Sequence, residues 1–503
     1  MNMKRNLQRA LSSLLLCTLL ITGLTVPASA ARFSDVPSHH WAAASIQRCV
    51  DLGLFQGRTA TTFGVGFPMS RGAFAVVLCR FFGWETPAIE SSSYTDVPAD
   101  DWYAAAVESA RAHGAITLQT SDFRPGDPIT REELAVALVR ALGLSPVAGL
   151  AQELQGPFHD VDTNKGYLTM AYDLGLVNGV STHQFSPDHA ATREQTAVIL
   201  MRLYDKLHAA APGKVGMASS AEDLPDLTGF EAVAIPAAKL FQSGTVKVVD
   251  NMAADKVTAI RQTAEASGTK QLLAVTGSEN TLRSGTPAEM AASIAAAVEE
   301  DGYDGLLLDL RKLRAGDLEQ TVKQLARETD LALGDKLFYL AVQAPVWKGE
   351  GSQAFDYETL AKFADRLLLQ PISYEDEVNG YAVAPAEPLE EVYYALRLLK
   401  DTGKLSLFMT TTGTVWSGDR KTGVITGLEA DALLADKYTE TYFSQRYGFS
   451  YMETGRVGRK ATVWYPDGKS AAERAELMRL FGVDQVVFSE LSGMSDSLLA
   501  GLW

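Results

Sequence analysis

Arginine and aspartate recur in register in the N-terminal part of the 503-residue chain. The pairs are Asp35 with Arg71, Asp96 with Arg131 and Asp160 with Arg193, separated by 36, 35 and 33 residues. A carboxylate at such a position caps a helix or orients a neighbour, and a guanidinium forms directed ion pairs. The simplest interpretation is that each residue only caps or pairs locally. Because the pairs repeat, they also indicate one chemical role carried out three times.

The segments around these residues repeat as well. Each aspartate lies in a short motif, at 33–37, 94–98 or 158–162, and each arginine follows Ser or Thr and precedes an apolar run. An aromatic residue stands eight positions before each arginine: Phe63, Phe123 and Phe185. The pattern predicts a helix, a loop rich in Gly and Pro, and a second helix capped by the hydroxyl. One such unit cannot bury its apolar face alone, so we expect the three units to share a core.

These three markers resemble the S-layer homology (SLH) domain in three consecutive repeats, at 31–90, 91–150 and 155–208. The resemblance implies an all-α domain that binds secondary polysaccharide of a Gram-positive cell wall, often through a pyruvate ketal on the sugar. A guanidinium fork matches both oxygens of the ketal carboxylate. On this basis the expected binding residues are the aspartates and arginines of all three repeats and two tryptophans of the first helices: Asp35, Trp41, Arg71, Asp96, Trp102, Arg131, Asp160 and Arg193.

The third repeat departs from this pattern. Gly166 stands where the other two repeats have Trp41 and Trp102. A tryptophan ring can stack on the face of a sugar, and glycine cannot. The departure puts equal use of three binding grooves in doubt.

The first thirty residues have the pattern of an export signal. A basic start with Lys4 and Arg5 precedes the apolar run 14–24, and Ala28 and Ala30 suit a cleavage site after residue 30. We expect a signal peptide at 1–30, a cell-surface location and no membrane-spanning segment in the mature chain.

After cleavage of the signal peptide, two cysteines, Cys49 and Cys79, would remain in the chain. We expect free buried thiols, although a disulfide between them is the alternative.

Composition excludes one class of partner. The chain has 61 acidic and 45 basic residues, a formal net charge of −16. This is the wrong sign for binding a phosphate backbone, so we expect no nucleic acid. No motif for a metal or an organic cofactor occurs, and we expect neither.

After a linker rich in Ala, Gly, Ser and Pro at 209–228, the pattern changes. Short apolar runs alternate with amphipathic stretches through 229–503, which predicts a parallel sheet covered by helices. The runs are 232–235, 272–275, 306–308, 337–340, 367–369, 405–408 and 486–488. About 275 residues suit a (β/α)8, TIM-barrel-like domain. An open doubly wound sheet is the alternative, but no Gly-rich phosphate motif follows the first strand. The fold class is therefore multidomain, SLH repeats plus α/β barrel.

The segment 301–311, DGYDGLLLDLR, resembles the fourth-strand motif of glycoside hydrolase family 18. The runs 364–371, 461–465 and 486–489 support the same order along the domain. In that family the motif ends in a glutamate that protonates the leaving oxygen while the substrate's acetamido group attacks. Here Asp304 and Asp309 remain, and Arg311 occupies the position of the glutamate. Ser489 similarly stands where the family has a tryptophan below the sugar.

Residues Leu307, Asp309 and Arg311 share one strand face, which we expect to point into the barrel. A guanidinium stays protonated, so Arg311 cannot act as the acid. We interpret Asp309 and Arg311 as an ion pair that fills the interior. Other side chains could rebuild an acid or line a sugar cleft, or could be ordinary loop residues. They are Glu350, Asp376 and Glu490 among the acids and Trp347, Tyr374 and Trp416 among the aromatics.

The sequence therefore predicts a wall-anchored surface protein whose barrel binds an N-acetylated glycan without cleaving it. The alternative is an active hydrolase of peptidoglycan or a chitin-like polymer with a displaced acid. A third possibility is a surface-layer subunit in which the barrel serves only as a spacer.

Overall fold

The computed structural model describes residues 33–118, 120–243, 245–347, 351–374, 383–455 and 460–502. The predicted signal peptide at 1–30 and the candidates Glu350 and Asp376 lie outside these residues. The chain forms two compact units. The first contains the described residues up to Leu134 together with Pro187–Met201, and the second contains Ala135–Ser186 together with the residues from Arg202 onward.

The first unit is helical, as predicted. Its helices, two of which continue into the second unit, are α2 (Ala43–Asp51), α3 (Arg71–Phe82), α4 (Ala104–Ala112), α5 (Arg131–Ala141) and α8 (Arg193–Leu207). The three repeat arginines are each the first residue of a helix, after a hydroxyl residue. Ser70 caps α3 by accepting a hydrogen bond from the amide of Ala73, and Thr130 accepts from the amide of Glu133. Helix, loop and capped helix are confirmed.

A closed set of backbone hydrogen bonds joins the three repeats. The amide of Met69 donates to Ala191, the amide of Ala191 donates to Ile129, and the amide of Ile129 donates back to Met69, at 2.8, 2.9 and 2.8 Å. Each residue lies two positions before a repeat arginine, so the same segment of each repeat meets the other two. The shared core predicted from the repeats is therefore present, with a pseudo-threefold arrangement at its centre.

The two cysteines lie in this unit. Both are free and buried, as expected from the sequence. Cys49 donates to the carbonyl oxygen of Ala197 at 3.6 Å, and Cys79 to that of Ala106 at 3.3 Å. Burial raises the pKa of the Cys49 thiol to about 12, so the thiolate is strongly disfavoured.

The second unit begins with two helices of the repeat region, α6 (Ser145–Ala151) and α7 (Lys165–Asp173). Gly166 is buried in α7, against α6. A β-carbon on Gly166 would fall against the carbonyl oxygen of Ala148 and 2.7 Å from the amide nitrogen of Gln152. The third repeat therefore lacks its tryptophan because helix α6 covers that position.

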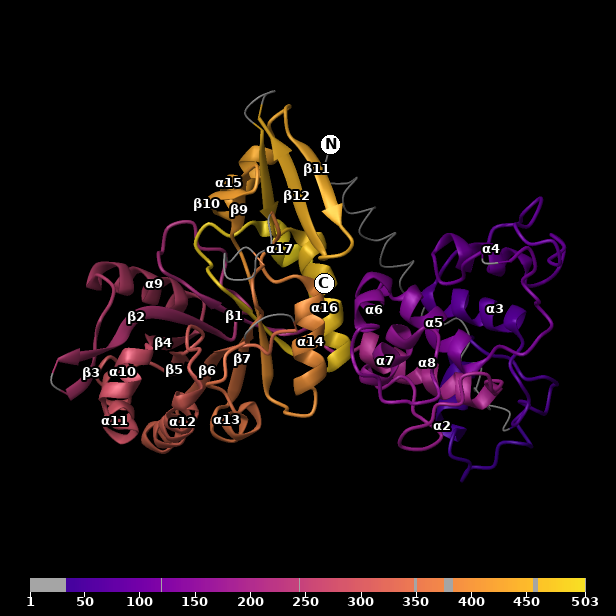
Figure 1. Ribbon diagram of the computed structural model, residues 1–503, viewed down its shortest axis with the longest axis horizontal. Coiled ribbons are helices and arrows are strands. Elements are labelled where there is room, and N and C mark those ends of the chain that lie inside the picture. The colour runs from indigo at the N-terminus through magenta and orange to yellow at the C-terminus, as the bar shows by residue number, and fades with distance from the viewer. Residues whose placement is uncertain are drawn as a thin grey trace, which may run out of the picture. The chain divides into compact units, whose positions relative to one another are not determined.

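The rest of the unit contains an eight-stranded parallel barrel (Figure 1). Its strands in spatial order are β1 (Gly213–Met217), β14 (Gln485–Phe488), β8 (Leu405–Met409), β7 (Arg366–Gln370), β6 (Leu337–Gln343), β5 (Gly305–Asp309), β4 (Lys270–Thr276) and β2 (Ala232–Ser243). Pairing of β1 with β2 closes the barrel, and the antiparallel strand β3 (Thr245–Asp250) extends β2. The (β/α)8 prediction is confirmed.

The linker prediction for 209–228 is wrong. Residues Gly213–Met217 form the first barrel strand, hydrogen-bonded to β14 and β2. The strand has only five residues, two of them glycine, and its composition matches that of a linker. The side chain of Leu491 occupies the space beside Gly216, which explains a small residue there.

Small, aliphatic and aromatic side chains fill the barrel, with Leu307, Tyr339, Phe408 and Val487 among them. Helices surround the strands (Figure 1). They are α9 (Ala254–Ala266), α10 (Glu279–Ser284), α11 (Pro287–Glu300), α12 (Glu319–Leu333) after the 3-10 turn η1 (Gly316–Leu318), α13 (Tyr357–Phe363), α14 (Leu389–Leu399), α16 (Gly468–Phe481) and α17 (Asp496–Ala500). None of the helices in the described part of the chain has the length and apolar character that a membrane crossing requires.

A second sheet is inserted between β8 and β14. Its antiparallel strands are β9 (Gly413–Ser417), β10 (Arg420–Ile425), β11 (Glu440–Ser444), β12 (Phe449–Thr454) and β13 (Ala461–Tyr465), with helix α15 (Gly427–Leu434) between β10 and β11. The sequence did not predict this sheet, because β10 and β11 are largely exposed and carry no continuous apolar run.

Candidate functional site

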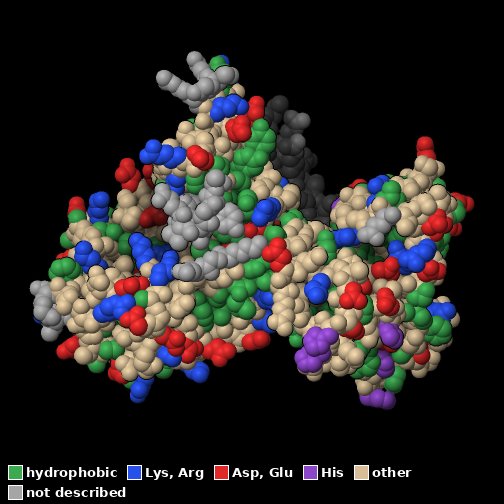
Figure 2. Space-filling view, in the orientation of Figure 1, with side chains coloured by type: hydrophobic (Ala, Val, Ile, Leu, Met, Phe, Trp, Pro, Cys, Tyr) green, Lys and Arg blue, Asp and Glu red, His purple; other side chains and the backbone are tan. Residues whose placement is uncertain are grey.

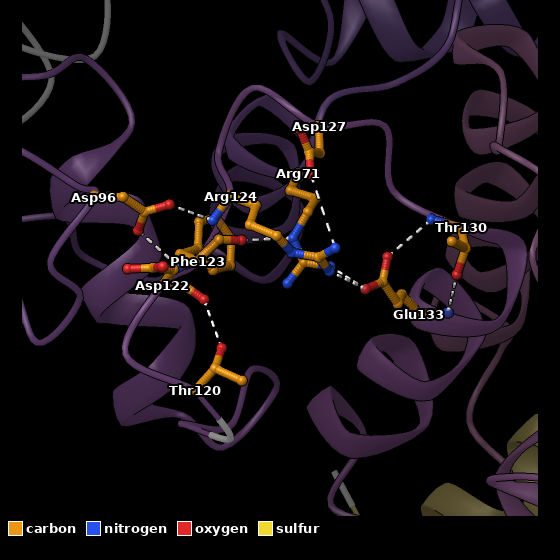
Figure 3. A network of polar contacts seen from close by, with 9 residues as sticks. All are labelled: Arg71, Asp96, Thr120, Asp122, Phe123, Arg124, Asp127, Thr130 and Glu133. Carbon is orange, nitrogen blue, oxygen red and sulfur yellow. Dashed lines mark hydrogen bonds and ion pairs between the residues drawn. The ribbon is translucent and has the colours of Figure 1, made fainter.

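Arg71 lies where the first repeat meets the second. Its Nε donates to the carbonyl oxygen of Phe123 at 2.7 Å, and its guanidinium lies over the Phe123 ring, 4.9 Å from the centroid. Its Nη1 pairs with Glu133 (Figure 3). Its Nη2 has no partner among the described residues. The side chain is thus held in place on three sides while one donor remains available.

Arg124 brings a second guanidinium to the same carboxylate. Its Nη2 lies 3.3 Å from Oε1 of Glu133, and Asp127 lies 3.8 Å from its Nη1 (Figure 3). The Arg124 side chain is 57% exposed, against 16% for Arg71. Two cations therefore converge on Glu133, one largely buried and the other mostly exposed to solvent. We call Arg71, Arg124 and Glu133 the first groove.

Arg193 repeats this geometry where the third repeat meets the first. Its Nε donates to Phe63 at 3.0 Å, its guanidinium lies 4.8 Å from the Phe63 ring centroid, and its Nη2 donates to Gln56 at 2.6 Å. Nη1 has no partner among the described residues. Burial lowers the pKa of Arg193, and the nearby charge of Arg58 lowers it further.

A cavity of about 480 Å³ lies beside Arg193, lined by Asp35, Arg58, Thr59, Thr62, Gly64, Val65 and Phe67. The Arg58 guanidinium stacks on the ring of Phe67 at 3.8 Å, and that ring is 50% exposed. We call Arg193, Arg58 and Phe67 with this cavity the second groove. It offers a cation pair and an aromatic face to a ligand.

The second guanidinium reaches the two grooves from different sequence positions. Arg124 follows the marker Phe123, and Gly64 holds the equivalent position after Phe63. A β-carbon on Gly64 would meet Cδ of Arg58 at 2.5 Å. The Arg58 side chain therefore occupies the space that Gly64 leaves open, and both grooves contain two guanidiniums.

The repeat aspartates hold the loops that carry the marker phenylalanines. Asp35 accepts from the amides of Phe63, Gly64 and Val65 at 2.7 to 3.0 Å. Asp96 accepts from Phe123 and Arg124, and Asp160 from Phe185 and Ser186. Partial burial raises the pKa of Asp35, but the backbone donors outweigh it and lower the pKa overall. The aspartates thus position the grooves, and Asp35 alone lines the cavity beside Arg193.

The two predicted tryptophans are exposed. Trp41 is 63% and Trp102 is 68% accessible. Trp102 precedes Tyr103, whose ring lies against Gly72, the residue after Arg71. Large exposed rings such as those of Trp41 and Trp102 suit stacking on sugars.

Arg131 begins α5, and its amide donates to the carbonyl oxygen of His189 at 2.9 Å.

At the barrel mouth, Asp309 and Arg311 form the expected ion pair. Nε and Nη2 of Arg311 donate to the two oxygens of Asp309 at 2.9 and 2.8 Å. Nη1 donates to Gln370 at 2.9 Å, and the guanidinium lies over Phe408, 4.2 Å from the ring centroid. Burial raises the pKa of Asp309, but hydrogen bonds and charge from Arg311 outweigh it and lower the pKa. Leu307 points into the barrel, so the predicted strand face is confirmed.

Two further candidate carboxylates lie at opposite ends of the barrel. Asp304 precedes β5 and accepts from the amide of Gln271 at 2.7 Å, far from the mouth. Glu490 follows β14 and accepts from the amides of Ser219 and Ser492, at 3.1 and 3.0 Å. Asp304 thus has a structural contact at the other end of the strand, and Glu490 links loops at the mouth.

Two of the three aromatic candidates for a sugar cleft, Tyr374 and Trp416, are buried. Their side chains are 1% and 4% exposed. Tyr374 donates into a buried pair of carboxylates on α14, Glu390 and Glu391, at 2.8 and 2.9 Å. Trp416 packs in the inserted sheet. Trp347 is partly exposed and stacks on Tyr394, 6.3 Å between centroids.

Comparison with known proteins accounts for the repeats. The family model of the S-layer homology domain matches residues 32–75, 93–135 and 157–197. The chain carries three SLH domains. The two grooves therefore lie between SLH domains, one between the first and second and one between the third and first.

Two curated relatives illustrate what the chain is similar to. "Exoglucanase XynX" of Acetivibrio thermocellus is 29% identical over 37% of this chain and 18% of its own length. "S-layer protein sap" of Bacillus anthracis is 23% identical over 81% of this chain and 43% of its own length. Across the first three curated relatives, the match spans only 10 to 23% of their length.

Among solved structures, a class V chitinase from Pseudomonas fluorescens Pf-5 matches with a TM-score of 0.50. It is 15% identical, and the match covers 58% of this chain and 98% of that protein. The likeness establishes the fold of the barrel, as the family 18 resemblance predicted.

Sequence reasoning missed several groove and mouth residues. Glu133, Arg124 and Arg58 meet the repeat arginines only across repeats, so no local spacing shows them. Glu387 is 1% exposed, accepts from Gln370 at 2.7 Å and from the amide of Thr410 at 2.9 Å, and extends the polar network of Arg311. Its position before α14 gave no signal because the family motifs do not include it.

Proposed function

We propose that this protein is held at the bacterial cell surface by its SLH domains, which bind an acidic secondary polysaccharide of the wall through the two grooves. The observation that supports this most strongly is the matched pair of guanidiniums in each groove. Arg71 and Arg193 each keep one terminal nitrogen without a partner among the described residues, while their other donors fix the ring-stacked geometry.

The chemistry suits a carboxylate on a sugar, as in a pyruvate ketal. A fixed guanidinium meets the carboxylate with little loss of side-chain entropy, and the exposed Arg124 or Arg58 closes on the second oxygen. The exposed rings of Phe67 and Trp102 offer faces for the sugar. Gly166 lies under α6 and offers none, so the proposal assigns binding to the first and second grooves.

The test is binding of the full chain to purified wall polysaccharide before and after mild acid removes the ketal. We expect Arg71→Ala and Arg193→Ala each to weaken binding about tenfold or more, because each removes a charge-assisted contact. Arg71→Lys keeps the charge but loses the fork and should also bind weakly. Arg111→Ala is the control, since Arg111 only pairs with Glu108 on its own helix. Equal binding by all variants, or by the ketal-free polymer, would refute the proposal.

For the barrel we propose glycan binding without hydrolysis. The support is the Arg311 guanidinium at the mouth, held by Asp309 and Gln370, where the family motif places its acid. The measurement is release of reducing sugar from peptidoglycan and N-acetylglucosamine oligomers, with binding measured on the same samples. Turnover that depends on Glu490 would instead support the alternative, an active hydrolase with a displaced acid. Neither binding nor turnover would leave the barrel as a spacer.

A further inference from the structure

A pocket of about 600 Å³ opens on the barrel beside the mouth, at the ends of β2 and β4. Its lining includes Lys239, Phe241, Gln242, Asn251, Asn280 and Lys312. The size suits one sugar unit with its substituents. Thr276 pairs in register with Asp309 across β4 and β5, so the pocket adjoins the Arg311 site but does not include it.

The charge of this pocket is opposite to that of the chain. Two lysines line it, and none of the described lining residues is acidic, although the net charge is −16. Lys239 makes no ion pair with any described residue. Lys312 feels the charge of Asp309, but Arg311 already pairs with both oxygens of that carboxylate. Acidic and basic side chains are interspersed over the visible face of the barrel (Figure 2). The surrounding surface therefore favours neither sign of charge, and the two lysines of the pocket favour a negatively charged ligand.

Two acidic residues of the neighbouring loops, Glu279 and Asp317, already have other partners. Glu279 accepts from the backbone amides of Arg314 and Ala315, at 2.8 and 3.1 Å. Asp317 pairs with Arg283. Both carboxylates therefore have other partners, and the two ammonium groups are available to a ligand.

The remaining lining groups suit a sugar. The side-chain amides of Gln242, Asn251 and Asn280 make no hydrogen bond to any described residue, so their donors and acceptors can meet hydroxyl or acetamido groups. Phe241 is 50% exposed and shares a strand face with Lys239. A half-exposed ring beside free amides and a cation gives a stacking surface, hydrogen bonds and a counter-charge in one place.

From these observations we infer that the pocket binds a sugar unit that carries a carboxylate. The inference rests on the proposed glycan binding by the barrel and names the class of sugar. It differs from the proposal for the SLH grooves, because it involves lysines of the barrel.

The test uses two sugars that differ in one group. N-acetylmuramic acid is N-acetylglucosamine with a lactyl ether that adds a carboxylate. Binding of each to the full chain is measured by calorimetry at low salt, in which the charge is least screened. We expect the acid to bind about tenfold more tightly than the neutral sugar.

The double variant Lys239→Gln/Lys312→Gln should bind the two sugars equally, with its melting temperature unchanged because both side chains are exposed. Lys362→Gln is the matched control, an exposed lysine on α13 outside the pocket, and should keep the preference. Arg71→Ala/Arg193→Ala tests whether the SLH grooves contribute, and it too should keep the preference.

Three results would overturn the inference. Equal binding of both sugars by the unaltered chain would leave glycan binding in place but exclude a site for a carboxylate. A preference that survives the lysine variant and disappears in the arginine variant would assign the acid to the SLH grooves. No binding of either sugar would refute the barrel proposal itself, and the inference with it.

Discussion

Replacing Arg311 with Met removes the cation that holds Asp309 at the barrel mouth. Asp309 would lose two side-chain hydrogen-bond donors, at 2.9 and 2.8 Å, and Gln370 would lose one donor. The stacking of the guanidinium on the Phe408 ring would also be lost. Breaking a buried pair by removing one partner costs about 3 to 5 kcal/mol. The two side chains are 14 and 20% exposed, so some water reaches them, and we expect about 2 to 3 kcal/mol at neutral pH.

The cost should depend on pH in a definite direction. In the unaltered chain the pKa of Asp309 is lowered below 3.8, so its stabilising contribution is present above pH 3.8 and is lost as the pH falls through the folded value. Without Arg311, burial remains and raises the pKa, so the carboxylate destabilises the fold once ionised. The difference between the two proteins should therefore be smallest at a pH below the lowered folded pKa of Asp309, where this carboxyl is protonated in both proteins, and should grow as the pH rises through that value.

The assay is urea unfolding at several pH values, followed by tryptophan fluorescence. Trp416 and Trp464 are 4% and 6% exposed and report on the second unit, whereas Trp41 and Trp102 are exposed already. The matched control is Asp309→Asn/Arg311→Met, which leaves no unpaired charge and should cost clearly less at neutral pH than the single variant. A cost that is the same at every pH, or the same for both variants, would refute the reasoning.

Three further predictions concern buried groups. Gly166→Ala should lower the free energy of unfolding by about 2 to 3 kcal/mol, because the methyl group falls against the backbone of α6; an unchanged urea midpoint would contradict this. Tyr374→Phe should cost about 2 kcal/mol, since two buried carboxylates lose their shared donor; a change under about 0.5 kcal/mol would contradict it. The thiols of Cys49 and Cys79 should react with a disulfide reagent at pH 8 only after unfolding; rapid reaction of the folded protein would contradict their burial.

The repeat architecture was accessible from the sequence because its markers are local. Phe63 and Phe123 are buried, and each lies under the arginine of another repeat, Arg193 or Arg71. Spacing gave the helices, the caps and the arginine positions. It could not give the partners, since Glu133 meets Arg71 only after the repeats close on one another.

The barrel strands were predictable where they are continuously apolar, which holds for seven of the eight. Strand β1 escaped because its five residues include two glycines. The buried state of Tyr374 also escaped. A tyrosine after a strand usually reaches solvent, but here α14 begins with Glu390 and Glu391, and their carboxylates give the hydroxyl group buried acceptors.

The three SLH domains differ at equivalent positions because the neighbouring residues differ. Helix α6 covers Gly166 and removes one stacking position, while Gly64 leaves room for Arg58 to supply the cation that Arg124 supplies in the first groove. In both grooves the repeat arginine is held by the carbonyl oxygen and the ring of the marker phenylalanine, Phe123 for Arg71 and Phe63 for Arg193. The buried guanidinium therefore belongs to the repeat, whereas the exposed one depends on neighbouring residues. Sequence comparison by repeat position alone would misjudge the second groove, because its second cation lies six residues away from the position that carries Arg124 in the first.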